Sequence, residues 1–102
     1  MIESKRGLQR LAMHFHDTRG MALANILICL QMGISTYDSS AGGLGGCPYA
    51  KGASGNVASE EVNYLFNSFG LETGIDHEKL RKASIEIFKI LGRASSIKLN
   101  KV

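Results

Sequence analysis

Three side chains in this sequence are of types that bind metal ions: His14 and His16 before a glycine-rich loop, and Asn56 after it. The histidines are two residues apart, so in a strand both imidazoles leave the same face and can converge on one ion. An amide oxygen beside two imidazoles suits Mg²⁺ or Mn²⁺ better than a closed zinc site. The pattern predicts a divalent-metal site. Structural histidines and a helix-capping Asn56 are the alternatives.

Two acidic residues lie close to these histidines in the sequence. Asp17 follows His16 directly, and it fits three roles: a metal ligand, an acceptor that fixes a histidine tautomer, or the cap of the next helix. Asp38 lies on the next expected strand, where we expect it to support the loop that follows. We assign neither Asp17 nor Asp38 as a general base that would remove a proton from a substrate.

The glycine-rich loop contains the second candidate for chemistry, Cys47 in a Gly-Gly-Cys-Pro turn. Repeated positive φ angles would let this segment close over a substrate and open again. The alternative is a flexible or phosphate-binding linker, but the Gly-Lys-Ser/Thr ending and the GxGxxG pattern are both missing. Cys29, inside an apolar run, is interpreted as a small core residue. The expected mobile loop comprises Gly42, Gly43, Leu44, Gly45, Gly46, Cys47, Pro48, Tyr49 and Ala50.

A strand–helix–strand unit should position the histidines. Residues 11–16 and 34–39 have strand character, and the apolar segment 20–32 between them predicts an interior helix that Gly33 ends. Such a unit gives two parallel strands joined by a right-handed crossover. Two parallel strands alone leave an unpaired edge on each side. We therefore predict an α/β fold in which residues 1–102 form the C-terminal portion of a TIM (β/α)₈ barrel.

Two further helices follow the loop. The first should be capped by Ser59 and end at Gly70, and the second should be capped by Asp76 and end at Gly92. Residues 93–102 have no clear period and are expected to form a loose tail. The expected buried positions are Val62, Leu65, Phe66 and Phe69 in the first helix, and Leu80, Ala83, Ile87 and Leu91 in the second.

Composition argues against two classes of partner. The net charge of +3 comes from basic residues that do not form a stripe, so no nucleic-acid partner is predicted. The longest apolar stretch, residues 21–30, contains Asn25 and is too short to cross a bilayer, so no membrane contact is predicted. An anionic substrate and an ordinary solvated surface both fit the mild positive charge.

The segments HFHDTRGMALANILICLQMGI, DSSAGGLGGCPYAKGASGNVASEEV and GLETGID together resemble the C-terminal third of the 3-hydroxy-3-methylglutaryl-CoA lyases, members of the DRE-TIM metallolyase superfamily. The resemblance spans residues 10 to 92. The related isopropylmalate and homocitrate synthases have a similar His-x-His segment but lack the Gly-Gly-Cys-Pro insertion. By analogy, the two strands would be the seventh and eighth of the barrel.

The resemblance implies that His14, His16 and Asn56 bind Mg²⁺ or Mn²⁺ and that Cys47 is the catalytic cysteine of the mobile loop. An acyl-CoA, 3-hydroxy-3-methylglutaryl-CoA, would be cleaved to acetyl-CoA and acetoacetate, with Cys47 giving a proton to the carbanion. The family's remaining metal aspartate, its arginine and its acidic base lie on earlier strands that match nothing here. We therefore expect the partner to be a missing N-terminal barrel portion, and this chain alone to be nearly inactive.

Two other functions of this chain fit the sequence. The chain would alternatively be a non-catalytic remnant that binds metal or acyl-CoA, or part of a related aldolase or synthase, although Cys47 disfavours the last. Open strand edges would also allow homo-oligomers. The expected compartment is the cytoplasm in a bacterium and the mitochondrial matrix in a eukaryote, where a targeting segment would precede these residues.

Overall fold

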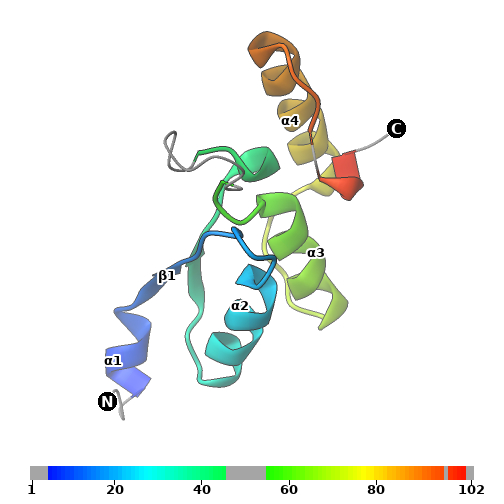
Figure 1. Cartoon of the computed structure of the whole chain (residues 1–102). Helices are drawn as coiled ribbons and strands as arrows, with labels where there is room; N and C mark the ends of the chain where they lie inside the picture. The colour runs from blue at the N-terminus through cyan, green and yellow to red at the C-terminus, as the bar shows by residue number, and fades with distance from the viewer. Residues whose placement is uncertain (1–4, 46–54, 96, 101–102) are drawn as a thin grey trace.

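The computed structural model describes residues 5–45, 55–95 and 97–100. The described residues include a pair of short parallel strands, against which the other elements are arranged (Figure 1). Strand β1 (Ala12–His14) pairs with β2 (Thr36–Asp38), and helix α2 (Ala22–Gln31) connects them. The register places Ala12 opposite Thr36 and His14 opposite Asp38. This arrangement confirms the predicted strand–helix–strand unit and its α/β class.

Both strands are shorter than predicted because the residues that follow them pair elsewhere. His16 forms an antiparallel bridge with Asn56, and Ser40 forms a parallel bridge with Ala58. Asn56 and Ala58 belong to the segment that returns from the glycine-rich loop. This segment therefore lies against the ends of both strands.

Local signals begin and end α2. The Asp17 carboxylate accepts a hydrogen bond from the Ala22 backbone N–H at 3.1 Å, which satisfies a free donor in the first turn. Gly33, at φ 96°, follows the last turn in a conformation that favours glycine. Of the three roles considered for Asp17, the structure shows the capping contact.

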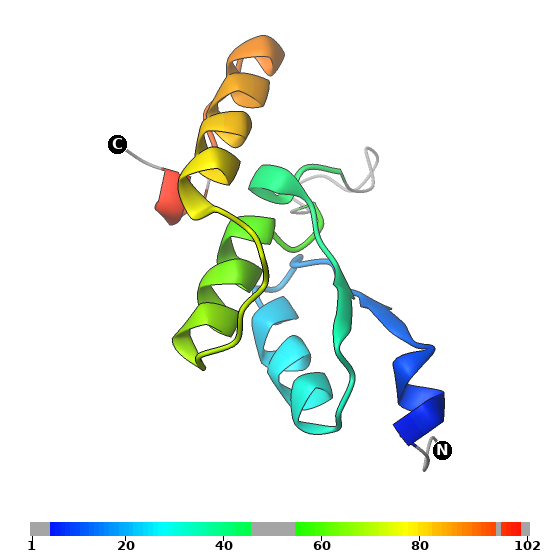
Figure 2. The ribbon, with the colours of Figure 1, turned by 180° about the vertical axis from the view of Figure 1, so that it is seen from behind.

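Helix α3 (Ser59–Ser68) lies beside α2 on one side of the strands, as both views show (Figures 1 and 2). The predicted Ser59 cap is wrong. The N-cap residue is Ala58, without a side-chain hydrogen bond, and the Ser59 hydroxyl lies 2.6 Å from the Ser39 hydroxyl instead. The core between the helices and the strands contains Ala22, Ile26, Val57 and Val62, with Phe15, Leu23, Tyr37, Leu65 and Phe66 packed against it.

Helix α4 (His77–Leu91) begins and ends as predicted but buries a different face. Asp76 accepts a hydrogen bond from the Lys79 N–H at 3.1 Å, and Gly92 ends the helix at φ 71°. The buried residues are Ser84 and Phe88, whereas the predicted stripe leaves Ala83, Ile87 and Leu91 exposed. The helix turns Ser84 toward a buried carboxylate and Phe88 toward a glycine, contacts that helical periodicity cannot reveal.

The remaining described elements are short. Helix α1 (Lys5–Gln9) precedes β1, η1 (Ala41–Gly43) follows β2, and η2 (Lys98–Asn100) is the last element among the described residues. Residues 97–100 contact α4, and Asn100 is buried, so this part of the tail is packed where a loose one was expected. Its anchor is a side-chain contact 40 residues away in sequence, which local patterns do not indicate. Within the described residues, every helix is too short or too polar to span a bilayer.

Candidate metal centre

The two faces of the strand pair differ sharply. Met13, Phe15 and Tyr37 face the core, while Ala12, His14 and His16 are exposed on the opposite face. The His14 and His16 ring centroids are 5.3 Å apart. The two imidazoles therefore share one open face at the carboxyl ends of the strands, as their spacing predicts. In a (β/α)₈ barrel, the face without helices is the interior.

Backbone pairing brings Asn56 to this edge. Beyond the bridge between His16 and Asn56, the Asp17 N–H donates to the Gly55 carbonyl at 3.2 Å and the Val57 N–H donates to the Phe15 carbonyl at 3.1 Å. Asn56 lies two residues before the N-cap of α3, so it does not cap that helix. The structure thus brings together the chain segments that carry the three predicted ligands.

Only one end of the Asn56 side-chain amide has a hydrogen-bond partner among the described residues. Its Nδ2 donates to the Leu44 carbonyl at 3.0 Å, which fixes the orientation of the amide. Its Oδ1 is buried and accepts no hydrogen bond from the described part of the chain. A buried acceptor without a partner costs about 1–3 kcal/mol, so such atoms call for an explanation such as a bound ion. A donor set of one neutral oxygen and two imidazoles would fit Mg²⁺ or Mn²⁺.

The two acidic candidates have separate positions. Asp17 caps α2, whereas Asp38 Oδ2 lies 3.4 Å from His14 Nδ1. Asp38 therefore contacts a histidine, and its expected support of the loop stays a prediction. Within residues 5–45, 55–95 and 97–100, no three His, Cys, Asp or Glu side chains are placed to bind one ion. The candidate donor set of the described chain is two imidazoles and an amide.

The first residues of the predicted mobile loop are tightly packed. Gly42 is buried at φ 64°, and a Cβ added there would lie 2.3 Å from Phe88 Cε2. A Cβ on Gly45 would lie 2.8 Å from Asn56 Nδ2, and one on Gly55 would lie 2.0 Å from the Gly43 carbonyl oxygen. These glycines permit close backbone packing at the base of the loop. Gly46, Cys47, Pro48, Tyr49 and Ala50 lie outside the described residues.

A buried carboxylate, Glu60, anchors the base of the loop, and no local sequence pattern predicts it. Glu60 has no exposed surface, and it accepts hydrogen bonds from the Gly42 N–H at 2.9 and 3.1 Å and from the Ser84 hydroxyl at 2.8 Å. The Asn100 amide donates to the same carboxylate. Glu60 thus joins η1, α3, α4 and η2. An acidic residue in the first turn of a helix ordinarily signals a favourable contact with the helix dipole, so no local pattern distinguishes this one.

Two ionisable groups next to the core have shifted pKa values. Burial, followed by the charges of Asp17 and Glu60, raises the pKa of Glu61 above 4.5. Burial, followed by Cys29, raises the pKa of Tyr37 to about 12. The Tyr37 hydroxyl donates to the Ile34 carbonyl at 2.6 Å. Burial therefore shifts the protonation equilibrium of both side chains toward the neutral form.

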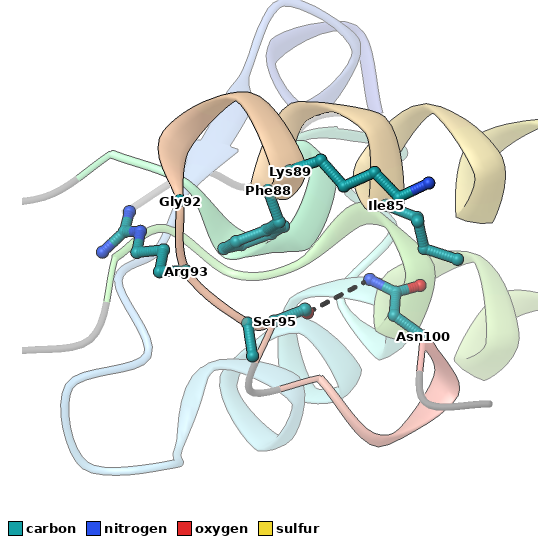
Figure 3. A pocket seen from close by; sticks show the side chains of 8 residues that line it. Ile85, Phe88, Lys89, Gly92, Arg93, Ser95 and Asn100 are labelled. Atoms are coloured by element: carbon teal, nitrogen blue, oxygen red, sulfur yellow. Dashed lines mark hydrogen bonds between the residues drawn. The ribbon is translucent and has the colours of Figure 1, made fainter.

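An open groove of about 640 Å³ lies at the C-terminal end of α4 and contains none of the predicted site residues (Figure 3). The Arg93 guanidinium carbon lies 5.6 Å from the Phe88 ring centroid. Asn100 Nδ2 lies 3.4 Å from Ser95 Oγ across the groove. Its lining consists of Ile85, Phe88, Lys89, Gly92, Arg93, Ala94, Ser95 and Asn100.

Comparisons with known proteins agree on one family. A mitochondrial hydroxymethylglutaryl-CoA lyase of Arabidopsis thaliana is 62% identical over 89 residues, which cover 87% of this chain and 19% of that protein. The Bacillus subtilis HMG-CoA lyase structure superposes with a TM-score of 0.86 at 46% identity, covering 91% of this chain and 31% of that one. An Acinetobacter baumannii HMG-CoA lyase, solved with coenzyme A and 3-methylmalate, gives 0.80 at 39% identity, covering 88% of this chain and 30% of that one.

These matches confirm the resemblance and the fold, a part of a (β/α)₈ barrel. The chain spans about a fifth to a third of the length of these relatives. The family model described as HMGL-like matches residues 4–87, which is most of the chain. By sequence and by structure, the chain belongs to the HMGL-like family.

Proposed function

We propose that this chain supplies His14, His16 and Asn56 as ligands of a divalent ion, Mg²⁺ or Mn²⁺, in a 3-hydroxy-3-methylglutaryl-CoA lyase. One observation carries the proposal: the Asn56 Oδ1 is buried without a hydrogen-bond partner in the described chain, on the segment that pairs with His16. The names of the relatives supply the reaction class. The proposed substrate is 3-hydroxy-3-methylglutaryl-CoA.

The proposed reaction breaks the bond between C2 and C3 of the substrate. The C3 hydroxyl loses its proton and becomes the ketone of acetoacetate, while the bonding electrons remain on C2 of the departing acetyl-CoA. A proton must then reach C2, and we assign its delivery to the Cys47 thiol. The bound ion would act as a Lewis acid on the substrate oxygens.

The described residues support this chemistry by position. The two imidazoles project from consecutive outward positions of one strand edge. The Leu44 carbonyl accepts a hydrogen bond from the Asn56 Nδ2, and the Asn56 Oδ1 has no partner among the described residues. The anchored turn at Gly42 fixes the start of the loop that carries Cys47. Donor atoms held in advance need no reorganisation when substrate binds.

Three residues do not fill an octahedral shell, and no general base is assigned in this chain. We propose that a polypeptide corresponding to the earlier strands of the barrel supplies the remaining ligand and the base. It would also cover the open edges of β1 and β2. Substrate and water oxygens would complete the shell. The compartment would be the cytoplasm or the mitochondrial matrix, according to the source organism.

A chimera tests this proposal directly. Residues 10–92 replace the matching segment of the Bacillus subtilis lyase, whose structure superposes with a TM-score of 0.86. We expect the chimera to cleave 3-hydroxy-3-methylglutaryl-CoA when Mg²⁺ or Mn²⁺ is present and to lose activity after chelation. An inactive chimera with a native circular dichroism spectrum and a cooperative unfolding transition would contradict the proposal.

The two cysteines provide a matched control within that chimera. Cys47→Ser should lower kcat by about a hundredfold or more, in the range typical of a lost general acid. Cys29→Ser should leave kcat nearly unchanged, because Cys29 lies on α2 and is half-buried. Equal losses in the two variants would remove the proton-donor role of Cys47. Released acetoacetate, measured enzymatically, reports the reaction.

A further inference from the structure

The contact between His14 and Asp38 follows from strand register. These residues are direct partners in the parallel pair, so their side chains leave the same face of β1 and β2. His14 Nδ1 lies 3.4 Å from Asp38 Oδ2, although 52% of the histidine side chain and 61% of the aspartate side chain remain exposed. Backbone pairing, and not burial, therefore brings the two groups together.

The charge states of the two groups define what the contact can do. A neutral imidazole carries one N–H, on either Nδ1 or Nε2, and an ionised carboxylate can only accept hydrogen bonds. A carboxylate next to Nδ1 therefore favours the tautomer that carries its proton on Nδ1. The lone pair is then on Nε2. A metal ion binds the nitrogen that carries the lone pair.

The nearby carboxylate of Asp17 makes a different contact, which is with a helix N-terminus. It follows His16 in sequence, but its Oδ1 accepts the Ala22 N–H at the start of α2. Asp17 therefore contacts the first turn of α2, whereas Asp38 contacts the His14 imidazole. In metalloproteins, a histidine ligand commonly donates its other N–H to a carboxylate, which fixes the ring and raises its basicity.

We propose that Asp38 is a positioning residue that accepts the Nδ1–H of His14 and thereby presents His14 Nε2 to the divalent ion. The metal part of this inference rests on the proposed function, whereas the tautomer part concerns the chain without metal. Because both side chains are half-exposed, the contact contributes little to folding. Its effect is on which nitrogen is free and on the orientation of the ring.

The first experiment measures the tautomer without metal. Long-range ¹H–¹⁵N spectra of the ¹⁵N-labelled chain are recorded at about pH 8.5, roughly two units above the ordinary histidine pKa of ~6.5. We expect the Nδ1–H form at His14 in the wild-type chain. In Asp38→Ala, His14 should revert to the Nε2–H form that an isolated histidine prefers in water, while His16 should not change.

The second experiment measures Mn²⁺ binding by the same chains, with the electron paramagnetic resonance signal of free Mn²⁺ as the readout. Asp38→Ala should raise the Kd about tenfold or more, the range found when such supporting carboxylates are removed. Thr36→Ala is the matched control, because Thr36 is exposed on the same strand and the same face, two residues from Asp38. It should leave both readouts unchanged.

The outcomes separate the possible roles of Asp38. An Nε2–H tautomer in the wild-type chain, or an unchanged tautomer in Asp38→Ala, would overturn the inference. Weaker Mn²⁺ binding with an unchanged tautomer would instead make Asp38 a direct ligand, which also overturns it. A tautomer that changes as expected in a wild-type chain that binds no Mn²⁺ would overturn the metal part of the inference for this chain, while the tautomer contact would stand and the activity of the chimera would decide the proposed function.

Discussion

Two polar regions adjoin the base of the glycine-rich loop, and they differ in how their hydrogen-bonding groups are matched. Glu60 is completely buried and accepts hydrogen bonds from a backbone N–H, a hydroxyl and an amide. At the strand edge, His14 is half-exposed and the Asn56 Oδ1 is buried without a partner among the described residues. The Glu60 carboxylate is matched by three donors inside the chain, which is typical of a structural anchor, although the Oδ1 of the Asn100 amide is buried without a partner among the described residues.

At the second region, two exposed imidazoles contribute little to stability, although His14 Nδ1 lies near Asp38. The buried Asn56 Oδ1, which has no partner among the described residues, costs stability, so folding does not explain it. The comparison teaches that a buried carboxylate surrounded by donors supports the fold. Because Asn63 Nδ2 and Asn100 Oδ1 are also buried without a partner among the described residues, the Asn56 Oδ1 indicates a site only together with the two imidazoles on the open face. Four substitutions test that division, in decreasing order of their expected effect on stability.

Glu60→Ala should cause the largest loss. Three donors, from Gly42, Ser84 and Asn100, would lose their acceptor, and each buried donor left alone costs about 1–3 kcal/mol, so we expect a loss of about 4 kcal/mol. Urea unfolding monitored by circular dichroism measures the change. Glu86→Ala, at an exposed position of α4, is the control and should stay within about 0.5 kcal/mol of the wild-type chain. Similar midpoints for the two variants would contradict the anchoring role.

Gly42→Ala should cost about 3 kcal/mol, because it combines a left-handed φ with overpacking against Phe88. Gly70→Ala is a matched control: its φ of 77° is also left-handed, but a Cβ there meets nothing within 4 Å. The control should lose only about 1 kcal/mol in the same urea measurement. Equal losses would show that the contact with Phe88 does not restrain the base of the loop.

Glu61→Gln should give a small, pH-dependent gain in stability. Burial first, and then the charges of Asp17 and Glu60, raise the pKa of Glu61 above 4.5 in the folded chain. A raised pKa stabilises the fold at low pH, and this contribution is lost as the pH rises through the folded-state pKa. The variant should therefore unfold at a higher urea concentration than wild type at about pH 7 and at an equal one at about pH 3. A gain that persists at low pH would contradict this electrostatic account.

His16→Ala should have the smallest effect on stability. The imidazole is exposed, and the bridge to Asn56 involves the backbone, so the free energy of unfolding should change by less than about 0.5 kcal/mol. Mn²⁺ binding should nevertheless weaken. Loss of stability on the scale of Glu60→Ala would mean that the strand edge is a structural cluster like the one around Glu60.

The parts of the fold that were predictable depend on neighbours in sequence. Gly33, Gly70 and Gly92 follow helix ends, Asp76 caps α4, and the two-residue spacing of the histidines sets their common face. Each of these features is decided within one turn or one strand. Local patterns are sufficient for such features.

The parts that were missed depend on contacts between distant segments. Nothing near Glu60 indicates that Gly42, Ser84 and Asn100 will surround it, and the same contacts turn α4 so that Ser84 and Phe88 are buried. The pairing of His14 with Asp38 likewise depends on strand register, which spans 24 residues of sequence. These contacts become visible only when the elements are placed together.

The most direct test of the proposed metal centre is the number of histidine nitrogens bound to the ion. Pulsed electron paramagnetic resonance of Mn²⁺ with the chain should show nitrogen couplings from two imidazoles, which change when histidine alone is labelled with ¹⁵N. His14→Ala and His16→Ala should each leave couplings from one. Mn²⁺ that shows no histidine coupling, or the same couplings in both variants, would contradict a shared ion at this strand edge.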